Sequence, residues 1–323
     1  MIDLQPAAVL EPARPLRRGR AESRQALRLI LQKHWLLYAM LIPAAIWLAL
    51  FHFYPLWGLT MAFKKYNIYR GFSASPWVGL DNFRQVFANP ECWRILRNTL
   101  WIALGKLFAG QAAALVFALM LNEIRVRLFK RTVQTLTTLP NFLSWVIVGG
   151  IMVELLTSTG GVNRLLGAFG LGPVGFLSDS NWFPWTMILS NTWKGFGFGA
   201  VIYLAALAGI NPELYEAAAV DGAGRGAALW YVTLPGILPT IVLMACLSLA
   251  GVLEAGFDQI YILQNPMVYA TGDILDTWVY RKGIVDSRYD LATAVGLIKS
   301  VLGFFLIWLS YWLADRFANY RVY

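Results

Sequence analysis

Six apolar segments divide the chain, and each has about the length needed to cross a membrane. Lipid offers the backbone no hydrogen-bond partner, so a spanning segment must be a helix of about 20 apolar residues. Tryptophans lie near the ends of three segments, as interfacial side chains do. The pattern predicts an all-α, polytopic integral membrane protein with six transmembrane helices, at residues 35–57, 99–121, 135–156, 182–208, 236–257 and 291–313.

The composition also indicates a lipid environment. Of the 323 residues, 58% are hydrophobic and 14% are charged, whereas soluble domains carry about a quarter charged residues. The net charge of +9 comes from Lys and Arg residues in the gaps between apolar segments. There they flank a bilayer and form no continuous basic face. We therefore expect membrane lipid, and no nucleic acid, among the partners.

Cysteine and histidine are too few to indicate a metal centre. Cys246 lies inside an apolar segment and Cys92 in a polar one, so neither a disulfide framework nor a Cys-based metal site is expected. His34 and His52 flank or lie within the first apolar segment. We predict no metal site in this chain.

The distribution of basic residues predicts the orientation. The segment 1–34 has seven Lys or Arg residues, and the short loop after the second apolar segment adds Arg125, Arg127, Lys130 and Arg131. Because short cytoplasmic loops are rich in Lys and Arg, both termini are predicted to be cytoplasmic. The longer loop 60–98 has six positive residues and argues the other way. The expected parts are a cytoplasmic segment 1–34, a transmembrane domain 35–316 and a cytoplasmic tail 317–323.

The loop between the fourth and fifth apolar segments predicts a short helix outside the bilayer. Asn211 is a good N-cap and Pro212 suits the first helical position. Glu213 and Glu216 favour the positive end of the helix dipole, and Gly222 provides a stop. An exposed helix with a small apolar face suits docking into a groove on a partner. The alternative is an ordinary loop helix on the membrane surface.

The spacing within this loop is specific. Glu216-Ala217-Ala218 is followed after three residues by Gly222, after nine more by Val232, and then by Leu234-Pro235. This pattern resembles the EAA loop of permeases in ATP-binding-cassette importers. Val232 replaces the usual isoleucine, which is a conservative difference.

The resemblance extends over about residues 35–320. Segments 139–145, 257–261, 265–266 and 273–281 look like those of carbohydrate-importer permeases for polysaccharides and large oligosaccharides, and in particular the alginate-importing members. The resemblance implies a permease fold like that of maltose permeases, in a bacterial cytoplasmic (inner) membrane. It also implies a coupling loop at 211–240.

In that family the EAA helix inserts into a cleft on an ATPase subunit. The resemblance therefore assigns the coupling contact to Glu216, Ala217, Ala218, Asp221 and Gly222. It implies as partners a second homologous permease subunit, two ATPase subunits that bind ATP and Mg, a solute-binding protein and a carbohydrate. No glycine-rich phosphate loop followed by Lys-Ser or Lys-Thr occurs in the chain. We expect no enzyme activity, catalytic residue or cofactor in this chain itself.

Three lysines, Lys106, Lys194 and Lys299, fall inside apolar segments. Snorkelling to the headgroups is adequate for Lys106 and Lys299, whereas Lys194 is too deep, and a deep charge usually faces a bundle interior or a watery cavity. The glycines and aromatic residues around Lys194 fit either a sugar pathway or tight helix packing. The candidate pathway residues are Asn191, Trp193, Lys194 and Phe196. A lysine there would suit an anionic, alginate-like sugar, and a neutral oligosaccharide remains the alternative.

Carboxylates near the outer ends of the segments have open roles. Glu154 and Glu254 are either interfacial or paired with Lys106 or Lys299. Asp258 is a candidate for the outer gate or for contact with the solute-binding protein.

Two other protein classes compete with the importer. A secondary transporter would carry internal repeats or ion-coupled carboxylates in mid-segment, and neither is seen here. A membrane enzyme would need a convergent set of His, Asp, Ser or Cys residues, and none is visible. Uptake that persists after ATP depletion but collapses with an ionophore would favour the first, and activity of the isolated chain the second.

Overall fold

A computed structural model describes residue 33 and residues 35–318. Apart from one isolated antiparallel bridge between Lys64 and Trp77, the regular structure of these residues is helical. The expected segment 1–34 lies outside the described residues except for Lys33, as do residues 319–323 of the expected tail. The chain divides into two compact units, Met1–Gly58 and Leu59–Tyr323.

Five helices among the described residues are long and apolar enough to cross a membrane: Trp35–Phe63, Pro90–Glu123, Trp145–Ala168, Arg225–Ala250 and Tyr289–Arg316. A sixth span results if α10 (Phe183–Ala208) and α11 (Pro212–Val220), which meet at a 68° bend, are counted together. Each predicted apolar segment overlaps one of these helices. The prediction of an all-α polytopic membrane protein is confirmed.

The first unit contributes one apolar helical segment. It consists of α2 (Trp35–Leu48), the π-helical turn η1 (Ala49–Phe53) and α3 (Tyr54–Leu56), and none of their residues is buried. An apolar helix without a buried face must be covered by lipid or by another chain.

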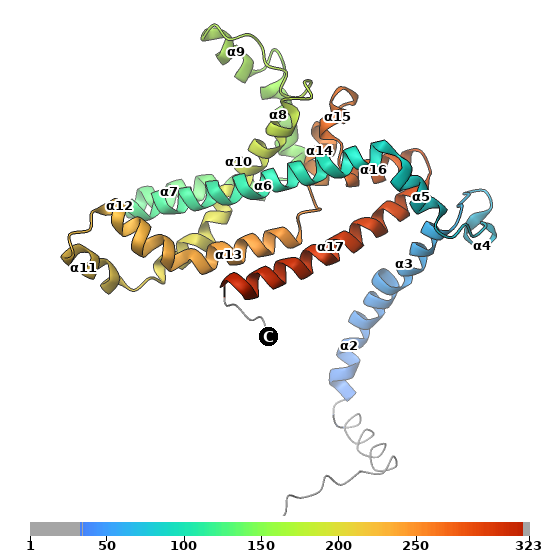
Figure 1. The fold of residues 1–323 in the computed structure, drawn as a ribbon, viewed down its shortest axis with the longest axis horizontal. Coiled ribbons are helices and arrows are strands. Elements are labelled where there is room, and N and C mark those ends of the chain that lie inside the picture. The colour runs from blue at the N-terminus through green and yellow to red at the C-terminus, as the bar shows by residue number, and fades with distance from the viewer. Residues whose placement is uncertain (1–32, 34, 319–323) are drawn as a thin grey trace, which may run out of the picture. The chain divides into compact units, whose positions relative to one another are not determined.

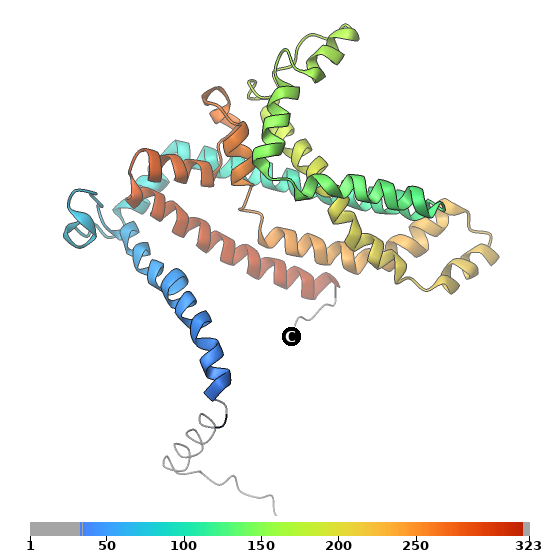
Figure 2. The same cartoon turned by 180° about the vertical axis from the view of Figure 1, so that it is seen from behind.

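Long helices pack in pairs within the second unit. The helix α6 (Pro90–Glu123) lies along α10, and α13 (Leu234–Ala250) lies along α17 (Tyr289–Ala318). Figures 1 and 2 show both pairs from opposite sides. Small residues allow the close approach, because Ala114 and Ala118 of α6 and Ala200 of α10 are buried in one shared cluster.

Short helices connect or precede these long ones. Between α13 and α17 lie α14 (Phe257–Leu263), η5 (Pro266–Val268), α15 (Tyr269–Gly272), α16 (Leu275–Tyr280) and η6 (Arg281–Val285). The others are η2 (Trp57–Phe63), α4 (Gly71–Ala74), α5 (Asp81–Ala88), α7 (Arg127–Thr138), η3 (Leu139–Phe142), α8 (Trp145–Leu156), α9 (Gly161–Ala168), α12 (Arg225–Ala228) and η4 (Leu229–Thr233).

Two predicted boundaries are wrong. Residues 135–156 are not one helix, because the chain leaves the α conformation after Thr138 and α8 starts only at Trp145, with the Ser144 hydroxyl accepting from the Ile147 amide at 3.4 Å. The fifth segment ends at Ala250, not at residue 257. Gly256 lies six residues after the end of the helix, at the N-cap of α14, and its φ of 91° is a left-handed conformation that redirects the chain into α14.

Candidate functional site

The predicted helix outside the long bundle is present as α11. The Asn211 carboxamide oxygen accepts a hydrogen bond from the Glu213 amide at 3.1 Å, which is the expected N-cap. At the other end the Gly222 amide donates to the Ala219 carbonyl and the Ala223 amide to the Ala218 carbonyl. These two bonds form a Schellman motif, which Gly222 permits with a φ of 78°.

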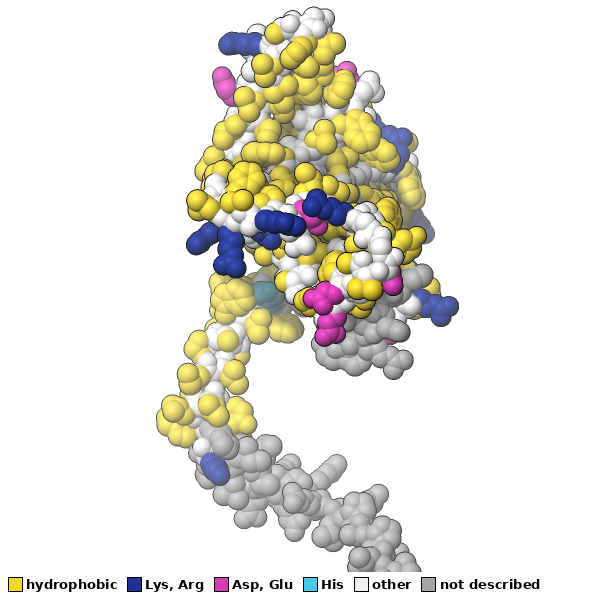
Figure 3. All heavy atoms as spheres, turned by 90° about the vertical axis from the view of Figure 1, so that its left-hand side faces the viewer, with side chains coloured by type: hydrophobic (Ala, Val, Ile, Leu, Met, Phe, Trp, Pro, Cys, Tyr) yellow, Lys and Arg dark blue, Asp and Glu magenta, His cyan; other side chains and the backbone are white. Residues whose placement is uncertain are grey.

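The side chains of α11 are available to a partner. None of its residues is buried, and Glu216, Ala217, Asp221 and Gly222 are exposed while Ala218 is half-buried. Figure 3 looks onto this end of the molecule, where acidic and basic side chains stand out from a largely hydrophobic surface. The exposed side chains of α11 are therefore accessible for docking into a groove on a partner.

One side chain ties α11 to the start of the next span. The Tyr215 hydroxyl lies 3.1 Å from the Thr233 hydroxyl of η4. Both residues line a cavity of about 530 Å³ that also includes Glu123, at the end of α6, and Arg225. Tyr215 therefore connects α11 to η4, which leads directly into α13.

A second cavity lies between α6, α10 and α13. It has a volume of about 210 Å³ and is lined by Lys106, Leu107, Gly110, Gln111, Ala114, Asn191, Thr192, Gly195, Phe196, Gly199, Tyr203, Met244 and Ser248. A neighbouring cavity of about 210 Å³ shares Lys106, Asn191 and Ser248 with it and reaches Glu254 and Gly256. The two cavities therefore lie next to each other beside the middle of α6.

The four candidate pathway residues do not converge. Asn191 and Phe196 line the cavity between the long helices. Trp193 is exposed on another face of α10, and Lys194 donates from Nζ to the Asn141 carbonyl of η3 at 2.9 Å. Successive residues of a helix are turned by about 100°, so four neighbours cannot all face one cavity.

Lys106 is the cation at this cavity, and it does not snorkel. Its side chain is buried and donates from Nζ to the Ala255 carbonyl at 2.6 Å and to Gln259 Oε1 at 2.5 Å. Gln259 in turn donates from Nε2 to the Met187 carbonyl at 2.9 Å and to the Ser190 hydroxyl at 2.8 Å. Sequence reasoning gave Gln259 no role, although it lies in the segment 257–261, because a single amide gives no periodic signal.

Lys299 has a different partner from those expected. Its Nζ lies 2.6 Å from Asp276 Oδ1 on α16. Neither Glu154 nor Glu254 forms an ion pair with Lys106 or Lys299 in the described structure. Asp258 has an exposed side chain in the first turn of α14.

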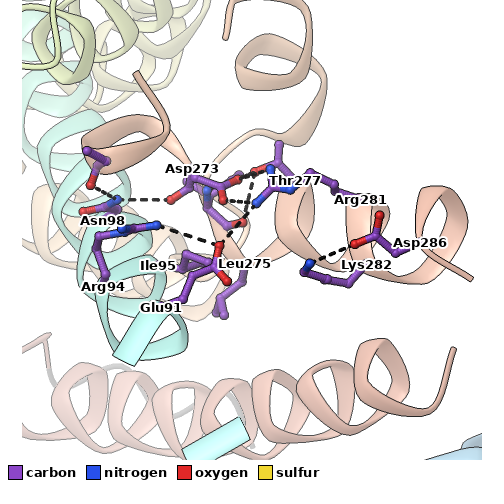
Figure 4. Close-up of polar contacts among 12 residues, drawn as sticks. Glu91, Arg94, Ile95, Asn98, Asp273, Leu275, Thr277, Arg281, Lys282 and Asp286 are labelled. Carbon is purple, nitrogen blue, oxygen red and sulfur yellow. Dashed lines mark hydrogen bonds and ion pairs between the residues drawn. The ribbon is translucent and has the colours of Figure 1, made fainter. Parts of the chain in front are cut away.

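A polar network fixes the connection between α13 and α17 (Figure 4). The carboxylate of Asp273 is fully buried. It accepts hydrogen bonds from the two terminal guanidinium nitrogens of Arg281, at 3.2 and 2.5 Å. The Thr277 hydroxyl donates to Asp273 Oδ1 at 2.8 Å, and Asn98 of α6 donates to the Asp273 carbonyl at 3.3 Å. The network holds α15 and α16 on the start of α6.

No group of three or more His, Cys, Asp or Glu side chains within residues 35–318 is placed to hold a metal ion.

Residues 109–319 match the model of a protein family described as binding-protein-dependent transport system inner membrane component. Among similar proteins of Bacillus subtilis (strain 168), Protein LplB is 41% identical over 282 residues, which cover 87% of this chain and 89% of that protein. The polygalacturonan/rhamnogalacturonan transport system permease protein YteP is 39% identical over 301 residues, 93% of each chain.

Two solved structures are also similar. One is a bacterial ABC transporter involved in the import of the acidic polysaccharide alginate, with a TM-score of 0.82 and 40% identity over 90% of this chain and 99% of that one. The other is a bacterial alginate ABC transporter in complex with an alginate pentasaccharide-bound periplasmic protein, with a TM-score of 0.81 and 39% identity over 90% and 98%.

Proposed function

We propose, on the premise that the chain belongs to the family of binding-protein-dependent transport system inner membrane components, that it forms half of a translocation pathway for an anionic polysaccharide. The chain is an ABC importer permease for oligo- or polysaccharides, a multi-pass inner membrane protein and a non-catalytic subunit. The nature of the sugar, the coupling contact and the individual partners belong to the proposal.

The exposed, doubly capped α11 is the observation that carries the coupling role. Its residues Glu216, Ala217, Ala218, Asp221 and Gly222 would contact an ATPase subunit that binds ATP and Mg. The bend of 68° from α10 and the absence of buried residues in α11 support this role. A second homologous permease subunit, a pair of ATPase subunits and a solute-binding protein would complete the complex. Residues 1–34 and 317–323 would lie in the cytoplasm on either side of the transmembrane domain 35–316.

Site-specific photo-crosslinking tests the coupling contact. A photoreactive amino acid at Ala217 in the assembled complex should crosslink to the ATPase subunit. The same amino acid at Leu165 of α9, which is 65% exposed, is the matched control and should not. The coupling contact is rejected if position 217 crosslinks only to lipid, or if positions 217 and 165 crosslink to the same partners.

The cavity supports a sugar pathway along α6, α10 and α13. Asn191 offers a carboxamide and Phe196 an aromatic ring at the same cavity, and pockets with a few polar groups and aromatic walls suit small carbohydrates. The cavity does not support a pathway role for Trp193 or Lys194, because Trp193 is exposed on another face of α10 and Lys194 donates to the Asn141 carbonyl. Asp258 stays a candidate for the outer gate or the binding-protein contact, because it is exposed beside the buried Gln259.

The charge of the sugar is inferred from the relatives. The alginate importer handles an acidic polysaccharide, and YteP is named for polygalacturonan and rhamnogalacturonan. Uptake of labelled oligogalacturonate and oligoalginate by proteoliposomes with the complete complex tests this class against neutral oligosaccharides. If only neutral oligosaccharides are taken up, the proposal of an anionic substrate is wrong and a neutral substrate takes its place.

A further inference from the structure

Lys106 is a buried cation on α6, within one of the helices long and apolar enough to cross a membrane. Its side chain is 8% exposed, and its two hydrogen-bond partners, Ala255 and Gln259, are neutral. Lys299, by contrast, is paired with the carboxylate of Asp276. A buried ammonium without a counter-charge is costly, and charges within the membrane usually mark a pathway or a ligand site.

We propose that the Lys106 ammonium binds the carboxylate of a uronate residue as the sugar passes the two cavities. The proposal rests on the proposed function and names the residue that distinguishes an acidic from a neutral chain.

The geometry leaves the ammonium one donor for a ligand. A lysine ammonium has three N–H donors, and within the described residues two are used, for the Ala255 carbonyl and for Gln259. Lys106 lines both cavities. A carboxylate in either cavity can therefore accept the third N–H and supply the missing negative charge.

Other polar groups of the cavity also lack partners. The Tyr203 hydroxyl and the Thr192 hydroxyl are buried and have no hydrogen-bond partner within the described chain. Both residues line the same cavity as Lys106. Buried polar groups are rarely left unpaired, so these two hydroxyls are hydrogen-bonding capacity at the wall of the cavity that the described chain does not use.

Two neutral side chains extend this polar lining. Gln111 donates from Nε2 to the Ser248 hydroxyl at 3.3 Å, so α6 and α13 meet at the cavity through hydrogen-bonding groups. Amides and hydroxyls can bind sugar hydroxyls but do not distinguish a uronate from its neutral ester. Only Lys106 among the residues that line this cavity carries a charge, so the discrimination by charge is assigned to it.

The neighbouring cavity contains one opposing charge. Glu254 lines it, has an exposed side chain and makes no ion pair with Lys106. Its carboxylate would repel a uronate near the outer end of the path. Glu254→Gln should therefore raise uptake of the acidic sugar relative to that of its neutral ester.

A structural role of Lys106 must be separated from a ligand role. The ammonium holds the segment before α14, and a Cβ added at Gly256 would lie 3.0 Å from its Nζ. Loss of that contact alone would lower the uptake of every substrate, whether charged or neutral. The test therefore compares oligogalacturonate with its methyl ester, which has the same shape and no charge.

The experiment uses the complete complex in proteoliposomes with Lys106→Gln, and reports uptake of each sugar relative to the unsubstituted complex. The solute-binding protein is the same in both, so its own preference cancels. We expect uptake of the acid to fall about tenfold or more, as for loss of a hydrogen bond to a charged group. Uptake of the ester should fall much less. Lys106→Arg should retain most of the acid uptake.

Lys299→Gln is the matched control, because Lys299 is also a lysine within a span but is paired with Asp276. It should change uptake of acid and ester to the same extent. Equal losses of acid and ester in Lys106→Gln would reduce Lys106 to a structural contact and overturn the proposal, as would no loss at all. If the unsubstituted complex imports the ester but not the acid, the proposed substrate class fails instead.

Discussion

Asp273 depends on one residue for its counter-charge. Its carboxylate is fully buried and held by both guanidinium nitrogens of Arg281, which also lies 3.8 Å from Glu91. The resemblance singled out the segment 273–281, but nothing in the sequence indicated that these two side chains pair. Asp273 precedes α16 and Arg281 follows it, so the pair spans this short helix.

Asp273→Asn should destabilise the second unit strongly. The substitution leaves a partly buried guanidinium without its main partner, and breaking such a pair costs about 3 kcal/mol or more. Thermal unfolding of the purified protein in detergent measures the loss.

The surface pair Lys282–Asp286 provides the control. The hydrogen bond from Lys282 lowers the pKa of the Asp286 carboxyl, so the pair is ionised at neutral pH. Both side chains are accessible to solvent, and exposed pairs contribute little. Asp286→Asn should leave the unfolding temperature nearly unchanged; an equal effect of both substitutions would show that burial does not govern the Asp273 pair.

A substitution at Gly222 tests whether the proposed coupling role depends on the turn that ends α11. A Cβ at this position would meet no atom within 4 Å, so Gly222→Ala is opposed only by the left-handed backbone, at about 1 kcal/mol. We expect a partial loss of sugar-stimulated ATP hydrolysis by the complex, and less loss with Gly222→Asn, since Asn tolerates this conformation better. Gly226→Ala is the control, because Gly226 has open space and no positive φ. Identical activity of all three variants would contradict a requirement for the Schellman turn.

Among the elements, α11 is the one that the sequence predicted most closely. Its N-cap, first-turn proline and terminal glycine are local signals, and the helix runs from Pro212 to Val220 as they indicate. The break between α7 and α8 was missed, because the apolar run continues through Pro140 and hydropathy alone does not register a change of direction. The cavity could not be predicted either, since three helices distant in sequence form it.

Tyr215→Phe should weaken the link between α11 and the fifth span. The substitution keeps the ring and removes the hydrogen bond to Thr233, a loss of about 1 kcal/mol. We expect the amount of sugar imported per ATP hydrolysed to fall by a few fold. Tyr231→Phe is the matched control, because the Tyr231 side chain is 82% exposed on the same π-helical turn. If the amount of sugar imported per ATP hydrolysed falls equally in both variants, the Tyr215–Thr233 hydrogen bond has no specific role in coupling.

At the scale of the whole molecule, several cations of the loop that argued against the predicted orientation have local partners. In residues 60–98, Arg84 lies 3.5 Å from Asp81, Arg94 lies 3.8 Å from Glu91, and the Lys64 ammonium donates to the Phe72 carbonyl at 2.9 Å. These contacts do not remove the positive charges from the count, because the positive-inside rule counts Lys and Arg and acidic neighbours contribute little. The conflict between this loop and the basic segments therefore calls for a direct test of the orientation.

The orientation can be tested by labelling engineered cysteines with a membrane-impermeant maleimide. Glu123 at the end of α6 and Tyr215 of α11 line one cavity, so the basic loop after α6 and α11 lie on the same side of the membrane. Basic short loops face the cytoplasm. In intact spheroplasts, a cysteine at Leu171 should therefore be labelled, and one at Ala223 only after permeabilisation. The native Cys92 must be replaced by serine, since it is partly exposed. Labelling of position 223 in intact spheroplasts would place α11 outside the cell, where no ATPase subunit could reach it, and the coupling role would fail with the orientation.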